Sequence, residues 1–274
     1  TLAQSECNRL AIEWFENKLS QTLSQIEEDF ASYRISDALM KAYRLFWDEF
    51  SGWLLEMIKP AYGAPADSTT LASVRSLFGR LMQMLHPFMP FLTEEIWQDL
   101  APRAAGESIC VSRMPVAGEI DETLLARFEL AKEVISHLRN LRKQKNLPNK
   151  EQLSLKVVAD VNYPSEYEPV IMKMANLSSI ERIGERDASS EAFIVKTTQY
   201  FVPLGGLMDV EVERKKLTDE LNYLEGFLAS VMKKLSNQRF VESAPEKVVA
   251  NERAKKTDAE AKISAIRERL EQMK

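Results

Sequence analysis

The sequence between Val210 and Leu235 reads VEVERKKLTDELNYLEGFLASVMKKL and has the most regular pattern of the chain. Mostly apolar residues recur there at alternating intervals of four and three: Val210, Arg214, Leu217, Leu221, Leu224, Leu228, Val231 and Leu235. A mean spacing of about 3.5 residues keeps one stripe of an α-helix facing a partner helix, as in a coiled coil. The stretch therefore predicts a long helix that requires a partner.

A second stripe follows Pro245 and can supply that partner. Its members step in the same way: Val249, Glu252, Lys256, Ala259, Ile263, Ile266, Leu270 and Met273. When the two stretches are folded back on each other, the numbers of facing residues have a nearly constant sum, as an antiparallel pair requires. The connection is too short for a parallel pair. Residues 208–274 are therefore predicted to form an antiparallel coiled-coil hairpin with a polar, cationic tip.

Residues 1–105 show the period of amphipathic helices. The apolar positions of a first helix, over residues 5–30, are Leu10, Trp14, Leu19, Leu23, Ile26 and Phe30. Asp37 is expected to cap a second helix that ends at Pro60. The inward side chains of this second helix would be Leu39, Tyr43, Phe46, Phe50, Trp53 or Leu54, and Met57. A third helix over 71–85 and a restart near Thr93 complete a predicted helix bundle.

The pattern of apolar and polar residues changes in residues 106–207. Leu153, Leu155 and Val157 alternate with polar residues, which is the period of a strand. The expected elements are a strand at 108–111, a helix over 121–146, strands near 153–157, 192–195 and 199–202, and a helix over 165–175. This region is therefore predicted to be a continuation helix followed by a small α+β unit of three or four strands. The fold class is mainly α.

The composition of the chain excludes some classes of fold and function. Only 9 of 274 residues are glycine, which argues against a β-sandwich and against a glycine-rich phosphate-binding loop. The net charge is −5, but one short run is strongly basic: Lys132, Arg139, Arg142, Lys143, Lys145 and Lys150, against Glu133 alone. Such a run is either a solvated helix end or a patch that contacts phosphates.

The residues of a catalytic or metal site are missing from the sequence. His86 and His137 have no metal-ligand spacing, and His86 is expected to be a packed or capping residue. Cys7 and Cys110 are too few for a disulfide scaffold and are compatible with a cytoplasmic protein. No membrane span, secretory signal, P-loop or nucleophile motif occurs, and the missing initial Met suggests a fragment. We therefore expect binding without catalysis and no metal site.

Five motifs in order resemble the C-terminal region of bacterial valyl-tRNA synthetases, a family of class I aminoacyl-tRNA synthetases. They are FWDEFSGWLLEMIKP at 46–60, LHPFMPFLTEEIW at 85–97, RNLR at 139–142 with NLP at 146–148, VPLGGLMD at 202–209, and FVESAPEKVV at 240–249 with Glu252-Arg253. The last two are similar to the valine enzyme in particular. The resemblance covers nearly the whole chain.

The resemblance implies that 1–105 is an anticodon-binding bundle and that 208–274 is a tRNA-binding arm, which contacts the elbow where the D and T loops meet. Implied anticodon contacts are Arg9, Arg34, Lys41 and Arg44. Candidate contacts to the tRNA backbone are Arg139, Arg142, Lys143 and Lys145. Candidate elbow contacts are Lys233, Lys234, Arg253, Lys255 and Lys256. Stacking of an aromatic ring on an unpaired anticodon base is also expected, although the sequence does not identify the ring.

The resemblance further implies that ATP and Mg²⁺ act in a catalytic core outside this chain. The expected partners are tRNA(Val) and the catalytic and editing domains of the same polypeptide, in a cytoplasmic monomer that does not bind a membrane. Two other hypotheses stay open at this point. The coiled coil would equally suit a protein–protein adaptor. The second hypothesis is that the chain is the equivalent region of an isoleucine enzyme. That region usually ends in a Cys-rich zinc element, which this chain lacks.

Overall fold

The computed structural model describes residues 2–185, 187, 190–204, 210–236 and 246–272. The chain divides into two compact units between Pro203 and Leu204, and each unit is described by itself. Within the described residues, no helix combines the length and the apolar character needed to cross a membrane. The predicted division into 1–105, 106–207 and 208–274 stays a prediction.

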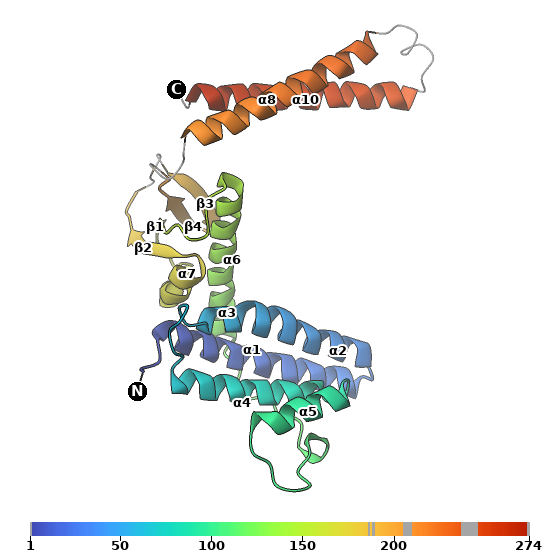
Figure 1. Cartoon of the computed structure of the whole chain (residues 1–274), viewed down its shortest axis with the longest axis vertical. Coiled ribbons are helices and arrows are strands. Elements are labelled where there is room, and N and C mark those ends of the chain that lie inside the picture. The colour runs from blue at the N-terminus through green and yellow to red at the C-terminus, as the bar shows by residue number, and fades with distance from the viewer. Residues whose placement is uncertain (1, 186, 188–189, 205–209, 237–245, 273–274) are drawn as a thin grey trace. The chain divides into compact units, whose positions relative to one another are not determined.

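Five helices form the bundle in the first unit (Figure 1). They are α1 (Glu6–Ala31), α2 (Ile35–Arg44) with its continuation α3 (Leu55–Ile58), α4 (Ser68–Leu85) and α5 (Pro90–Leu100). Ser5 and Asp67 cap α1 and α4, because their side chains accept hydrogen bonds from backbone N–H groups of the first turn. The helices predicted over 5–30 and 71–85 are confirmed.

The second helix differs from its prediction in three ways. It begins at Ile35, with Arg34 rather than Asp37 at the cap position. Residues Leu45–Leu54 (η1) form a π-helical segment between α2 and α3, which the apolar spacing did not indicate. Leu39 and Tyr43 were expected in the core, yet both are exposed. The reason is that Ala38 and Ala42 occupy the buried face, where small side chains allow α2 to lie close to its neighbour.

Aromatic side chains fill the centre of the bundle. Trp14 stacks on Phe128 at 4.4 Å between ring centroids, and Phe15 lies against Phe50 at 5.5 Å. Trp14, Phe15 and Phe128 are fully buried. Because Phe128 belongs to α6 (Glu122–Lys145), the continuation helix shares this core with the bundle.

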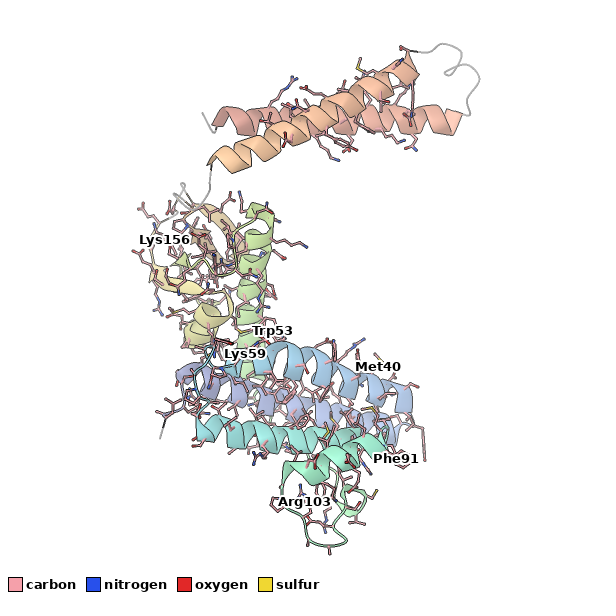
Figure 2. The ribbon with its side chains drawn as sticks, in the orientation of Figure 1. Met40, Trp53, Lys59, Phe91, Arg103 and Lys156 are labelled. Carbon is pink, nitrogen blue, oxygen red and sulfur yellow. The ribbon has the colours of Figure 1, made fainter. Side chains whose placement is uncertain are left out.

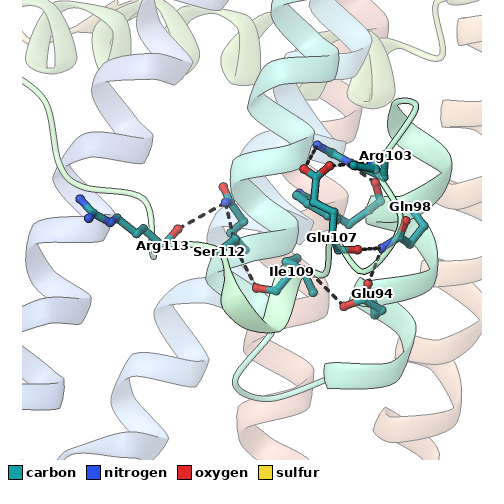
Figure 3. A network of polar contacts seen from close by, with 10 residues as sticks. Glu94, Gln98, Arg103, Glu107, Ile109, Ser112 and Arg113 are labelled. Carbon is teal, nitrogen blue, oxygen red and sulfur yellow. Dashed lines mark hydrogen bonds and ion pairs between the residues drawn. The ribbon is translucent and has the colours of Figure 1, made fainter.

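The segment after α5 corrects two predictions. The helix begins at Pro90, the first helical position, and not near Thr93. The strand expected at 108–111 is wrong, since Ile109–Val111 (η2) is a single 3₁₀ turn. Glu94 supplies the hydrogen bonds that a neighbouring strand would have made: its carboxylate accepts from the Ser108 hydroxyl at 2.7 Å and from the Ile109 N–H at 3.0 Å (Figure 3).

A four-stranded sheet follows α6. Its strands are β1 (Leu153–Val158), β2 (Leu177–Arg182), β3 (Glu191–Val195) and β4 (Thr198–Val202), in the order β2-β1-β4-β3. β1 and β2 are parallel and are joined through η3 (Ser165–Tyr167) and α7 (Glu168–Met174), whereas β4 is antiparallel to both neighbours. The sequence predicted β1, β3, β4 and the helical segment, but β2 was missed because its exposed polar residues hide the strand period.

The second unit consists of α8 (Val210–Leu235) and α10 (Glu246–Gln272), which lie against each other. Lys234 forms an ion pair with Glu252, and Glu225 forms one with Arg267. As position 234 moves back to 225, its partner advances from 252 to 267, so the helices are antiparallel. Val231, Ala259 and Ile263 are buried between them. Most of the predicted hairpin tip, residues 237–245, and the seam residue Met273 lie outside the described residues.

Candidate nucleic-acid interface

The turn between α1 and α2 contains a buried charge. Asp29, in the last turn of α1, is completely inaccessible to solvent. Its carboxylate forms an ion pair with Arg34 at 2.8 Å and a second with Lys41. The Asp29 carbonyl also accepts a hydrogen bond from the Arg34 N–H at 2.8 Å. Two of the four predicted anticodon contacts, Arg34 and Lys41, are thus brought together by one carboxylate.

The other two predicted anticodon contacts lie elsewhere. Arg44 is exposed near the end of α2, with no ion pair among the described residues. Arg9 lies in the first turns of α1 and pairs with Glu6 at 2.7 Å and Glu13 at 2.8 Å. Twenty residues of helix, about 30 Å, separate it from Asp29. The structure therefore does not bring Arg9 together with the cations around α2.

The exposed face of α2 and η1 carries aromatic rings. Tyr43 is 50% exposed and Trp47 is 60% exposed, and their rings stack with centroids 6.4 Å apart and planes 8° from parallel. Met40 lies one turn earlier on the same helix and is also exposed (Figure 2). Arg44 follows Tyr43 directly. An aromatic surface beside a free cation is the usual composition of a site for single-stranded nucleic acid.

Two further rings are exposed at one end of the bundle. Tyr33, in the α1–α2 turn, is 90% exposed, and Phe91, in the first turn of α5, is 91% exposed (Figure 2). The α1–α2 and α4–α5 turns lie at the same end of the bundle (Figure 1). Phe30 stacks on Phe88 there at 6.2 Å and ties the two turns together.

Arg142 lies inside the first unit and not on its surface. Only 4% of the residue is accessible, and burial lowers the pKa of its guanidinium, although Arg still stays charged at neutral pH. The guanidinium donates four hydrogen bonds, of 2.8 to 3.2 Å, to the backbone carbonyls of Pro148, Glu151, Ala175 and Asn176. The four N–H groups of the two terminal nitrogens are thus engaged with backbone carbonyls, so Arg142 is the buried member of the four predicted tRNA-backbone contacts and its position does not support that prediction.

Other cations of the basic run are also engaged within the protein. Lys145 pairs with Glu191, and Lys132 pairs with Glu49 at 2.9 Å. Arg139 lies 5.2 Å above the ring of Trp53. Among the described residues, Lys143 is exposed without an ion pair. Of the four predicted backbone contacts, Arg139 and Lys143 are therefore the two that are exposed and form no ion pair among the described residues.

The two helices of the second unit hold a buried glutamate. Glu252 lies at a seam position and is nearly inaccessible. Its carboxylate accepts a hydrogen bond from Lys255 at 2.7 Å and lies 3.6 Å from Lys234 on the other helix. The bond from Lys255 holds the pKa of Glu252 below its usual value, against the opposing effect of burial. Two of the predicted elbow contacts are thus bound to one anion.

The three remaining predicted elbow contacts are accessible to solvent. Lys233 and Arg253 are exposed and have no ion pair among the described residues, and Lys256 is paired loosely with Glu260 at 3.7 Å. Tyr223 and Phe227 add two exposed rings on α8. Exposed cations can attract a phosphate backbone, and exposed rings can stack on bases.

His86, at the C-terminal end of α4, is half-buried and bonded to two side chains, in line with the expectation of a packed or capping residue. Its Nδ1 lies 2.7 Å from the Thr93 hydroxyl, and its Nε2 lies 3.2 Å from the Cys110 sulfur. Within the described ranges, no three His, Cys, Asp or Glu side chains gather as a metal site.

Comparison with known proteins defines the class. Residues 13–158, more than half of the chain, match the family of the anticodon-binding domain of tRNA ligase, so the class is that of tRNA-binding regions of tRNA ligases. Residues 209–274 match a second family, the valyl tRNA synthetase tRNA binding arm. The chain therefore belongs to the family of the anticodon-binding domain of tRNA ligase, and over nearly its whole length it matches the C-terminal region of valyl-tRNA synthetases.

Individual relatives agree with this assignment. The chain is 48% identical over 270 residues to a valine–tRNA ligase of Parabacteroides distasonis, and 48% identical over 273 residues to that of Phocaeicola vulgatus. It is 32% identical over 286 residues to that of Listeria innocua. These alignments cover 98%, 100% and 98% of the chain but only 31%, 31% and 32% of the relatives. The chain thus spans about a third of their length.

Proposed function

We propose that this chain is the part of a valine–tRNA ligase that binds tRNA(Val). The bundle binds the anticodon stem and loop, and the second unit binds the elbow. ATP, Mg²⁺ and the aminoacylation of tRNA belong to the part of the enzyme outside this chain, which works as a cytoplasmic monomer. The sequence supports that division, because it contains neither a nucleotide-binding loop nor the His-x-Gly-His motif of the class I catalytic core.

One observation carries the assignment of the bundle. Bulky rings are exposed on α2 and in its turn, beside Arg44, whereas such side chains are normally buried. Unpaired RNA bases are recognised by stacking on aromatic rings, with cations nearby for the phosphates. Tyr43 and Trp47 already present parallel rings to solvent. The anticodon loop is the part of a tRNA that offers unpaired bases at the end of a short stem.

For the second unit, we propose that α8 and α10 form an antiparallel coiled-coil hairpin. The buried seam residues and the two ion pairs between the helices support this geometry. A hairpin of about 25 residues per helix extends for about 40 Å. Its outward cations and rings can therefore contact a tRNA surface far from the anticodon.

Filter binding of the purified chain to tRNA(Val) and to other tRNAs, over a series of salt concentrations, tests the proposal. We expect affinity for tRNA(Val) that falls steeply with salt and exceeds the affinity for the other tRNAs. The absence of binding at low salt would contradict tRNA binding by this chain. Equal affinity for every tRNA would leave tRNA binding in place but contradict its specificity.

A further inference from the structure

Tyr33 combines two properties that stability alone does not explain. It has a φ of +57°, in the left-handed region where side chains other than those of Gly and Asn are disfavoured. Its ring is 90% exposed, so burial of the ring does not compensate for the strain. A glycine would form the same turn without that cost. Strained residues that the surrounding structure nevertheless maintains are typical of functional sites.

The structure around Tyr33 fixes the turn from both sides. Asp29, completely buried, binds the Arg34 backbone through its carbonyl and the Arg34 and Lys41 side chains through its carboxylate. The Tyr33 N–H donates to the Phe30 carbonyl at 3.0 Å. Because the carboxylate already holds both cations, their charges serve first to fix the turn.

Phe91 offers a second exposed ring at the same end of the bundle. The Phe30–Phe88 stack joins the α1–α2 turn to the α4–α5 turn, and Phe91 follows directly after Pro90. Proline restricts the backbone at the start of α5, so this ring also projects from a rigid support. Both rings leave their faces open to a planar ligand.

We propose that Tyr33 is the ring that stacks on an unpaired anticodon base, with Phe91 as a second stacking surface at the same end. Asp29, Arg34 and Lys41 are positioning residues for Tyr33, and Arg44, at the other end of α2, is the cation that binds phosphate. This inference rests on the proposed function and assigns new roles to Arg34 and Lys41. It identifies a stacking residue that the sequence did not single out.

The first experiment separates the ring from the fold. The full chain and its Tyr33→Gly and Tyr33→Phe variants are titrated with an RNA hairpin that has the anticodon stem and loop of tRNA(Val). Loss of one base stack corresponds to a fall in affinity of about 5- to 100-fold for Tyr33→Gly. Tyr33→Phe should bind like wild type. The thermal midpoint of Tyr33→Gly should equal or exceed that of wild type, because the strain is relieved.

The second experiment tests the positioning residues through the salt dependence of binding. Arg34→Gln and Lys41→Gln should weaken hairpin binding without changing the slope of log affinity against log salt. Arg44→Gln should reduce that slope by about 1, as expected for the loss of a phosphate contact.

The matched control for Tyr33→Gly is the same RNA stem closed by a stable tetraloop. Tyr33→Gly should bind this control RNA with the same affinity as wild type.

Each failure has a distinct meaning. If the wild-type chain binds neither tRNA(Val) nor the hairpin, the proposed function fails. Two outcomes would contradict the role of Tyr33 when wild type binds both RNAs. In the first, Tyr33→Gly binds the hairpin as tightly as wild type does. In the second, Tyr33→Gly loses as much affinity for the tetraloop stem as for the hairpin. A salt slope reduced by about 1 in Arg34→Gln would make Arg34 a phosphate contact and overturn its positioning role.

Discussion

The basic run of α6 and the cations of the arm, α8 with α10, look alike in sequence but are used differently. In α6, Arg142 is enclosed by backbone carbonyls and Lys145 is held by a carboxylate. In the arm, Lys233 and Arg253 stand in solvent. The difference follows from packing. α6 contacts α1, α7 and β3, whereas the described parts of the arm helices pack mainly on each other. A cluster of cations indicates a binding surface only where the helix has a free face.

The largest expected effect comes from Arg142→Ala. Four backbone carbonyls, one of them in a fully buried hydrogen bond, would each lose a donor, and hydrogen bonds to a charged group contribute about 1.5–3 kcal/mol. We expect the free energy of unfolding to fall by about 3 kcal/mol in urea denaturation. Lys143→Ala, one residue along the helix and exposed, is the matched control and should change it by less than about 0.5 kcal/mol.

The structural role assigned to Arg142 would be wrong if Arg142→Ala were as stable as wild type. It would also be wrong if the variant folded normally and the slope of log affinity for tRNA against log salt fell by the amount expected for one phosphate contact. Arg142→Lys separates the two contributions of the side chain, because Lys keeps the charge but not the planar fork of donors. We expect Arg142→Lys to unfold at a urea concentration between those of Arg142→Ala and wild type.

The sequence predicted the elements better than the faces they expose. Helices over 5–30, 71–85 and 121–146 were found because a period near 3.6 residues directly reflects burial on one side. The π-helical segment η1 breaks that period, so inward positions extrapolated back from Phe50 were wrong for Tyr43 and Leu39. The small residues Ala38 and Ala42 marked the true buried face, but an apolar count gives them little weight.

The candidate site was predictable in its charge and not in its geometry. The resemblance selected Arg34 and Lys41, but their common partner Asp29 lies in a different helix turn, and no local pattern links the three. Tyr33 sits between two helices, and the sequence does not reveal its positive φ. Arg142 was counted with the basic run because its neighbours in the sequence are basic. Its burial could not be predicted, since its partners are backbone carbonyls, which every residue has.

A smaller effect is expected from reversing the free charges of the arm. Lys233→Glu with Arg253→Glu breaks no ion pair of the described residues, so the fold should be unaffected. We expect affinity for tRNA(Val) to fall at least about tenfold, and the salt slope to fall by about 2. The double variant Lys233→Arg with Arg253→Lys retains both charges and should bind like wild type. Filter binding measures both quantities.

If the charge reversal left the affinity and the slope unchanged, the arm cations would be as uninvolved in RNA binding as Arg142. The cations of α6 and of the arm would then differ only in their exposure to solvent, and not in their role in RNA binding. Equal losses in the reversed and the charge-retaining variants would instead indicate a disturbed arm, which circular dichroism would detect as reduced helicity.

The smallest effect concerns Glu252, which is buried between the two arm helices. Lys255, and to a lesser degree Lys234, keep the pKa of Glu252 below its ordinary value of 4.5. A group whose pKa is lower in the folded state stabilises that state above its unfolded pKa, and this contribution disappears as the pH falls through the folded pKa. Glu252 should therefore stabilise the α8–α10 pair at neutral pH and cease to do so well below pH 4.5.

Hydrogen exchange of the α8 and α10 amides, corrected for intrinsic rates, measures this difference. At pH 6 wild type should be more protected than Glu252→Gln, and the two should converge as Glu252 becomes protonated. Glu260→Gln is the matched control, because that carboxylate is exposed and only loosely paired, so its protection should follow wild type at every pH. If the gap between wild type and Glu252→Gln persisted in acid, the packing of this side chain, and not its charge, would hold the two helices together at the cationic end.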